Sequence, residues 1–281
     1  MLIRFAQSLN NLCPKTPKSG FSLVELSIVL VILGLLVGGV LSGQSLIRAS
    51  ELRKIVTTQD KYRGAVMSFR DKYFALPSDM TNATAFWGAK TATGCTNNAG
   101  APRNAANGTC DGDGDGFIYA ATSANSEYYR VWEQLSRAGL VEGSYAYSTS
   151  SGLTEAQSIG VEIPALGVGR GGVNLQYVGV VNGVNMRNPS LHGNTGHFFI
   201  MGGASPFATN LQGGITKPDE AYSIDIKIDD GSPASGTMLA RYDGSIPDVL
   251  TTRCTSFFNN PSAVYNLSFT AQTCFLAFKL Q

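Results

Sequence analysis

A run of 22 consecutive residues without a charge, Leu26 to Ile47, most limits how this 281-residue chain can fold. At about 1.5 Å per residue, a helix of this length spans the ~30 Å hydrocarbon core of a membrane with little to spare. A secretory signal peptide has a shorter apolar region and carries its small-residue cleavage site after that region. Here Gly20 lies before the apolar run. The sequence therefore predicts a membrane-spanning helix and not a secretory signal peptide.

Glu25 is a charged residue at the start of this apolar segment. An ionised carboxylate at the end of a membrane helix costs on the order of 3 kcal/mol unless it finds a partner. Cleavage after Gly20 would supply one, because the new α-amino group of Phe21 would lie about one helical turn from Glu25. The alternative is a Glu25 carboxylate that is solvated in the headgroup layer.

The segment Gly20-Phe21-Ser22-Leu23-Val24-Glu25-Leu26 resembles the type III signal of type IV prepilins and type II secretion pseudopilins. The resemblance implies that the prepilin peptidase cuts after Gly20, that the same enzyme methylates the new N-terminal Phe21, and that Glu25 guides subunit docking. The implied partners are this peptidase, the chain's own copies and other pilin subunits, and an inner-membrane assembly platform. The implied location is a single-pass inner-membrane precursor with a cytoplasmic leader and an extracytoplasmic head, and then a pilus or a periplasmic pseudopilus.

Two features of this segment depart from a common pattern of that family. The leader has 20 residues, which is longer than in many type IV pilins, and the apolar helix lacks the proline that many pilins carry. Glycines at 34, 38, 39 and 43 have small-xxx-small spacing, which would allow neighbouring helices to approach closely. Basic residues after the apolar run would by themselves favour the opposite membrane orientation. The resemblance requires a cytoplasmic leader, and we follow it.

Beyond the membrane segment, a helical pattern of apolar residues continues to Tyr73, and Pro77 ends it. The apolar side chains recur mostly every three, four or seven residues, which predicts one stripe that packs on a sheet. The alternative is a membrane anchor followed by an unrelated soluble domain. We expect four parts: a cleaved leader (1–20), a transmembrane assembly helix (21–47), its amphipathic continuation (48–75) and a globular head (76–281).

Charges are unevenly distributed, although the net charge of the chain is only +1. From Arg48 to Lys72 there are seven basic and three acidic residues, whereas the chain after Lys72 has 11 basic and 16 acidic residues. A basic arm therefore leads into an acidic head. Nothing in this balance indicates nucleic acid as a partner.

Five cysteines are present, and Cys13 lies in the leader. Removal of the leader would leave an even number, in two pairs separated by 15 and 20 residues. This spacing is consistent with two disulfides, Cys95–Cys110 and Cys254–Cys274, in an oxidising compartment outside the cytoplasm. Four buried free thiols are the alternative.

The head alternates short β-like runs with turns, which predicts an antiparallel sheet. One helix is expected from Glu127 to Ala138, closed by Gly139, with Trp132 in the core and not at a ligand. Together with the long N-terminal helix packed on the sheet, this gives an α+β, pilin-like fold. The expected strands are 159–166, 173–181, 197–201, 222–228, 237–242, 264–270 and 275–280.

The segment Asp111-Gly112-Asp113-Gly114-Asp115-Gly116-Phe117-Ile118 matches the first half of an EF-hand calcium loop. Asp111, Asp113 and Asp115 would converge on one hard cation, and the carbonyl of Phe117 would add a ligand. The usual glutamate is missing from the twelfth position, so Glu127 is the candidate to complete the coordination. The alternative is a solvated acidic turn without an ion.

Three other groups have weaker chemical signatures. His192 and His197 do not have a recognised metal-binding spacing. The stretch 167–172 satisfies G-x-G-x-x-G but has no surrounding βαβ unit, so we expect a turn. No catalytic motif is convincing, and we expect no enzyme activity. A second acidic group fits a solvated turn better than a site, and it comprises Asp219, Glu220, Asp225, Asp229 and Asp230.

These features predict a structural subunit that is cleaved at Gly20 and assembled into a filament through residues 26–43, with calcium stabilising the head. A type II secretion pseudopilin and a minor adhesive pilin are the alternatives within the family. A signal-anchored extracytoplasmic enzyme is an alternative from another class. A calcium-dependent sugar-binding module is a further one, because Tyr128, Tyr129 and Trp132 follow the acidic loop.

Overall fold

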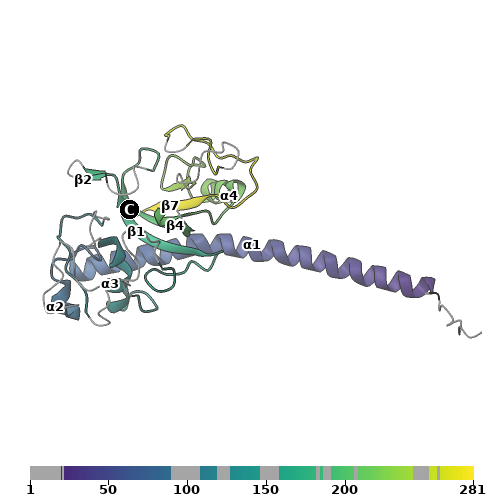
Figure 1. Ribbon diagram of the computed structural model, residues 1–281, viewed down its shortest axis with the longest axis horizontal. Helices are drawn as coiled ribbons and strands as arrows, with labels where there is room; N and C mark the ends of the chain where they lie inside the picture. Colours follow the sequence, from purple (N-terminus) through teal and green to yellow (C-terminus); the bar gives the residue numbers. More distant parts are fainter. Residues whose placement is uncertain are drawn as a thin grey trace, which may run out of the picture. The chain divides into compact units, whose positions relative to one another are not determined.

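The computed structural model describes the chain in two compact units, Met1–Ala49 and Ser50–Gln281 (Figure 1). The leader residues 1–19 and Phe21 lie outside the described residues. The described residues are 20, 22–89, 108–118, 127–145, 158–181, 184–185, 191–205, 208–242, 253–257 and 260–281.

Helix α1, Leu23–Tyr73, is continuous over 51 residues and confirms the predicted long N-terminal helix. Its large apolar side chains from Leu23 to Ile47 are exposed. Among the described helices, α1 is the one that is long and apolar enough to cross a membrane. It ends where Phe74 adopts a positive φ of 54°, three residues before Pro77.

The second half of α1 supplies one wall of the head's core. Its fully buried side chains include Ile55, Val66 and Phe69, which share one face because their separations are sums of three- and four-residue steps. The ring of Tyr62, on the same face, meets Trp132 edge to face with centroids 4.7 Å apart. Each large apolar side chain buried here contributes about 1.5–3 kcal/mol, so this face binds the helix firmly to the head.

An antiparallel sheet forms the centre of the head, as predicted (Figure 1). Its strand order is β1 (Gly171–Val178), β4 (Gly196–Ser205), β7 (Phe275–Lys279) and β6 (Met238–Arg241). Strand β5 (Ala208–Gly213) also pairs with β4, and β2 (Val180–Val181) pairs with β3 (Val184–Asn185). In the register, Leu175 faces Phe199, which in turn faces Phe278, and all three side chains are buried.

Among the described residues, three short elements lie between α1 and the sheet in sequence. They are α2 (Ala83–Trp87), the 3₁₀ helix η1 (Glu127–Tyr129) and α3 (Val131–Arg137). The last two confirm the helix predicted from Glu127, and Gly139 follows it with a φ of 73°. Trp132 is fully buried, as expected of a core residue. Tyr128 is buried as well, so these two aromatic rings are not available to stack on a sugar.

The predicted strand 222–228 is wrong, because these residues belong to helix α4, Pro218–Ile228. Apolar residues alternate from Tyr222 to Ile228, and this pattern suggested a strand. The helix is instead favoured by Pro218 in its first turn and by Glu220, whose carboxylate accepts the backbone N–H of Lys217 at 2.9 Å.

Two further predicted strands, 159–166 and 264–270, form only isolated bridges. In the second, Tyr265 bridges to Thr255, and the chain then turns as the N–H of Phe269 donates to the carbonyl of Asn266. The other four predicted strands correspond to β1 with β2, β4, β6 and β7.

The disulfide predicted between Cys254 and Cys274 is present. Both cysteines are fully buried, and Cys274 directly precedes β7. Cys110 is also disulfide-bonded, whereas Cys95, its predicted partner, lies outside the described residues.

Candidate functional site

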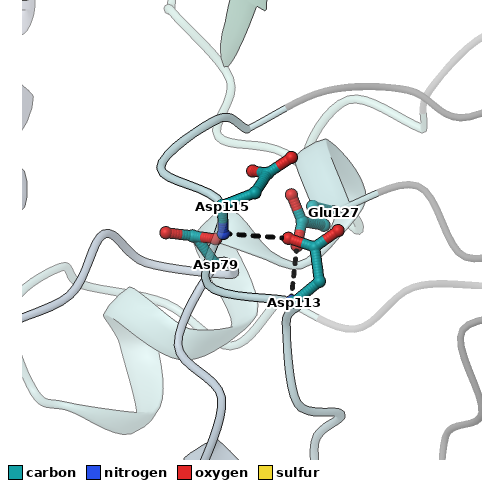
Figure 2. Close-up of side chains that lie close together, drawn as sticks. All are labelled: Asp79, Asp113, Asp115 and Glu127. Atoms are coloured by element: carbon teal, nitrogen blue, oxygen red, sulfur yellow. Dashed lines mark hydrogen bonds between the residues drawn. The ribbon is translucent and has the colours of Figure 1, made fainter. Parts of the chain in front are cut away.

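Four carboxylates from three segments meet in the head (Figure 2). Asp113 and Asp115 come from the acidic loop, Glu127 begins η1, and Asp79 belongs to the turn that follows α1. One oxygen from each carboxylate lies within 4.8 Å of the other three. Calcium holds its oxygen ligands at about 2.3–2.6 Å, so two ligands on opposite sides of the ion are about 5 Å apart. The four oxygens therefore fit one calcium coordination sphere.

Backbone hydrogen bonds place the acidic loop against the turn that carries Asp79. The N–H groups of Gly112 and Gly114 donate to the carbonyls of Met80 and Asp79, at 2.8 and 3.0 Å. A Cβ added at Gly112 would overlap the backbone of Ser78 and Asp79, so this approach requires glycine. Segments more than 30 residues apart in the chain are thus joined through main-chain atoms.

The loop also bonds to its own carboxylates and to Glu127. The N–H of Asp115 donates to Asp113 Oδ1 at 3.2 Å, and the N–H of Asp113 donates to Glu127 Oε1 at 3.3 Å (Figure 2). The N–H of Gly116 donates to Asp79 Oδ2 at 3.2 Å. These bonds hold the loop beside Asp79 and Glu127, which are buried, while Asp113 and Asp115 remain exposed to solvent.

Asp79 and Glu127 are buried acids, with only 5% and 8% of their surfaces exposed. Within the described part of the chain, Asp79 Oδ1 and Glu127 Oε2 are buried oxygens without a hydrogen-bond partner. Burial, and then the charge of Asp113, raises the pKa of Glu127 from 4.5 to about 9. Burial, and then the charge of Asp115, raises the pKa of Asp79. A cation bound here would satisfy both orphan oxygens and offset the mutual repulsion of the carboxylates.

Asp111 does not join this cluster, which corrects our prediction for that residue. Its Oδ1 accepts the backbone N–H of Thr84 at 2.7 Å, and its Oδ2 accepts the Thr84 hydroxyl at 2.9 Å. Thr84 lies in the first turn of α2, where helix N–H groups have no partner within the helix. Asp111 therefore caps α2, and Asp79, which sequence reasoning missed, takes its place among the carboxylates. A lone aspartate more than 30 residues before the loop carries no signal that could have identified it.

Phe117 follows the acidic residues and anchors the end of the loop. Its ring contacts that of Tyr177 on β1, with centroids 4.6 Å apart, and its N–H donates to Asp115 Oδ1 at 2.8 Å. The carbonyl oxygen of Phe117 as a metal ligand remains a prediction.

The second acidic group serves a structural purpose. Asp225 is fully buried and accepts the Tyr265 hydroxyl at 2.7 Å, while Asp229 accepts the N–H groups of Thr237 and Met238. Asp230 accepts the N–H of Ser232 at 2.8 Å. These carboxylates connect the end of α4 to neighbouring segments through hydrogen bonds.

The two histidines lie in different parts of the head. His192 bonds through its ring nitrogens to the carbonyls of Asn260 and Ala240, both at 3.0 Å. His197, on β4, accepts the backbone N–H of Ile118 at Nε2, at 3.1 Å. The glycine-rich stretch 167–172 forms the predicted turn into β1.

Gly20 is described and exposed, and it lies three residues before the start of α1, whereas Phe21 lies outside the described residues. Glu25 is in the first turn of α1, and its Oε2 accepts the backbone N–H of Ser22 at 2.9 Å. The carboxylate thus lies at the end of the helix where the new N-terminus would form after cleavage.

Comparison with known families places a recognised motif on this segment. Residues 15–41 match the model of the prokaryotic N-terminal methylation motif. No curated protein and no solved structure shows significant similarity to the chain. The motif, the membrane-length apolar helix and the antiparallel head suit a membrane-anchored, pilin-like precursor, for which the motif implies processing by a prepilin peptidase and assembly with pilin subunits. The chain therefore carries a prepilin-type N-terminal signal, as type IV pilins and type II secretion pseudopilins do.

Proposed function

We propose that this chain is a non-catalytic structural subunit of a type IV pilus-like filament, and that calcium stabilises its head. The observation that carries the first part is the methylation motif at residues 15–41, on a helix that exposes its apolar side chains from Leu23 to Ile47. Such a surface needs lipid before assembly and sister helices after it, because exposed apolar area of this extent is unfavourable in water.

Processing is tested by intact mass and N-terminal sequencing of the protein purified from membranes of its native cell. The expected product begins at N-methylated Phe21. The Gly20→Val variant should keep its leader, because the prepilin-type signal has glycine at the cleavage site and valine would place a bulky β-branched side chain there. An unmodified Met1 start in the wild-type protein would contradict the processing route and leave a signal-anchored protein.

Assembly is tested by fractionating cells that express the wild-type chain or Glu25→Ala. We expect the variant to be cleaved normally and to be absent from sheared filaments, because Glu25 is the charged partner offered to the new N-terminus. Recovery of wild-type subunits from the cell surface would identify a pilus. Recovery only from a periplasmic assembly would identify a type II secretion pseudopilus.

The calcium proposal depends on the buried, unpartnered oxygens of Asp79 and Glu127 beside Asp113 and Asp115. All four residues offer hard oxygen ligands, and calcium binds six to eight oxygens, so carbonyls and water would complete the shell. The ion would supply no reaction chemistry. It would neutralise the carboxylates and join the turn after α1, the acidic loop and η1.

Isothermal titration of the full-length chain in detergent micelles tests this site. We expect one calcium per chain, and at 100 times the dissociation constant about 2.7 kcal/mol of added stability. Glu127→Gln should abolish most of the binding heat. A wild-type protein that gives no heat and no thermal shift with calcium would overturn the proposed site.

A further inference from the structure

The acidic loop is attached at its start by a buried side chain that is not itself a candidate ligand. Gln134, on α3, is fully buried. Its Oε1 accepts the backbone N–H of Ser78 at 2.6 Å, and its Nε2 donates to the carbonyl of Cys110 at 3.1 Å. Ser78 directly precedes Asp79, and Cys110 directly precedes the loop. One amide therefore sets the spacing between the turn that carries Asp79 and the loop that carries Asp113.

Ser78 extends this connection to the third carboxylate segment. Its hydroxyl donates to the carbonyl oxygen of Glu127, and its backbone has a positive φ of 78°. A non-glycine residue in this conformation is sterically unfavourable and needs support from its surroundings. The hydrogen bond from Ser78 to Gln134 provides such support next to the carboxylates.

The end of the loop is attached to the sheet by His197. Its Nε2 accepts the N–H of Ile118, so this nitrogen carries the lone pair and the ring is neutral. Burial also lowers the pKa of His197 to about 4, which keeps the ring neutral at physiological pH. The centroids of the His197 and Tyr177 rings are 5.3 Å apart, and the Tyr177 ring in turn packs against that of Phe117. The sheet thus fixes the chain immediately after the loop's last glycine.

We propose that Gln134 and His197 are positioning residues that hold the four carboxylates together before the ion binds. This inference rests on the calcium site proposed above. Ordering a loop on binding costs conformational entropy, and crowding carboxylates costs electrostatic free energy. Hydrogen bonds fix both ends of the loop when the protein folds. The loop is therefore already ordered, and its carboxylates are already close together, before the ion binds. Each residue acts on calcium only through the groups that it places.

The test compares calcium dissociation constants of full-length variants in detergent micelles, measured by isothermal titration. Gln134→Met removes the amide hydrogen bonds to Ser78, Cys110 and Thr109, and His197→Phe keeps an aromatic ring but removes the acceptor. Each should weaken calcium binding by about tenfold or more, as losses of supporting partners at metal sites do. His197→Gln places an amide oxygen where Nε2 accepts, and it should restore affinity to within about threefold of wild type.

Matched controls separate positioning from general stability. His192→Phe alters the other histidine, which is buried, and Gln176→Met alters a buried amide on β1 whose Nε2 has no partner among the described residues. Both should leave the calcium dissociation constant unchanged, even if His192→Phe lowers the melting temperature. If Gln134→Met or His197→Phe fails to fold by circular dichroism, Ser78→Ala tests the same network with a smaller change and an expected loss of about threefold.

The outcomes distinguish this inference from the calcium proposal itself. Wild-type affinity that is unchanged in Gln134→Met, His197→Phe and Ser78→Ala would overturn the positioning role while leaving the calcium site intact. Absence of calcium binding by the wild-type chain would overturn both. Weakened binding in these variants with unchanged binding in His192→Phe and Gln176→Met supports the inference.

Discussion

The backbone N–H of Asp113 donates to Glu127 Oε1 at 3.3 Å, and the other oxygen of Glu127 is buried without a partner among the described residues. The bond ties the acidic loop to η1 across 14 positions in the chain. One carboxylate oxygen of Glu127 also lies within 4.8 Å of an oxygen from each of three other acids (Figure 2). A carboxylate in such surroundings must either take up a proton or bind a cation.

The actual set of carboxylates can be tested against the set that the sequence suggested. We expect Asp79→Asn to weaken calcium binding by about 10- to 100-fold, because it removes a charge and an unpartnered buried oxygen from the cluster. Asp111→Asn should change affinity far less, because Asp111 bonds Thr84 instead. Isothermal titration of both variants checks this. A larger loss of affinity in Asp111→Asn than in Asp79→Asn would favour the EF-hand-like ligand set predicted from the sequence.

The stability of the calcium-free protein should fall as pH rises from 7 to 9. The pKa of Glu127 is raised by burial to about 9, so the folded state keeps a proton that the unfolded state has already released above pH 4.5. The resulting slope is at most about 1.4 kcal/mol per pH unit for one group. The stabilisation contributed by the proton on Glu127 is fully present below pH 4.5 and is lost as the pH rises through 9.

This pH window lies above the range in which Asp225 and His197 titrate in the folded protein. The pKa of Asp225 is raised by burial to about 6, and that of His197 is lowered by burial to about 4. Burial also raises the pKa of Asp79, so the comparison with Glu127→Gln isolates the part of the slope that Glu127 contributes. Chemical denaturation in EGTA provides the measurement, with Glu127→Gln as the variant that should lose most of the slope. Calcium should also prevent this loss of stability between pH 7 and 9, because it binds the ionised carboxylate. A flat profile for the wild-type protein in EGTA would be inconsistent with a buried Glu127.

Loss of the disulfide between Cys254 and Cys274 should destabilise the head by about 3 kcal/mol, because it closes a loop with a sequence separation of 20. For a domain of this size, that corresponds to a fall of about 6–12 °C in Tm. The double variant Cys254→Ala/Cys274→Ala, measured by thermal denaturation, tests this. Cys13→Ala is the matched control and should leave the processed protein unchanged, since it lies in the leader.

Gly112→Ala should weaken calcium binding and lower stability by about 1–3 kcal/mol, because its Cβ would overlap the backbone of Ser78 and Asp79. Gly64, on α1, provides the contrast. Nothing lies within 4 Å of a Cβ added there, so Gly64→Ala should raise stability by up to about 1 kcal/mol through helix propensity. Thermal denaturation with and without calcium measures both, and equal effects of the two substitutions would argue against close apposition of loop and turn.

The acidic loop illustrates how far a local motif can be interpreted. The alternation of aspartate and glycine from Asp111 to Gly116 directed attention to this loop, and the structure brings Glu127 close to Asp113 and Asp115. The motif could not indicate that Asp111 would cap α2, because the partner Thr84 is 27 residues away. Hydrogen-bond partners of this kind are decided by the path of the backbone and not by neighbouring residues.

For helix α4, the sequence pattern predicted the wrong type of secondary structure. Alternating apolar residues from Tyr222 to Ile228 fit a strand, yet Pro218 and Glu220 favour a helix start, and Ala221, Ile224 and Asp225 form its buried side. Asp225 is fully buried because Tyr265, 40 residues later, donates a hydrogen bond to it. Period-two and helical patterns overlap over such a short stretch, so the spacing of apolar residues alone could not distinguish a strand from a helix.

The sequence by itself determined the organisation of the chain as far as Tyr73, because the interactions that matter there are local. The uncharged run after Glu25 sets the membrane-spanning helix, Gly20 and Phe21 mark the processing signal, and the apolar spacing to Tyr73 predicts the continuation of α1. Tertiary structure alone decided which carboxylates meet. Asp79 joins Asp113, Asp115 and Glu127 only because main-chain bonds, Gln134 and the sheet bring distant segments together, and such contacts have no local pattern in the sequence.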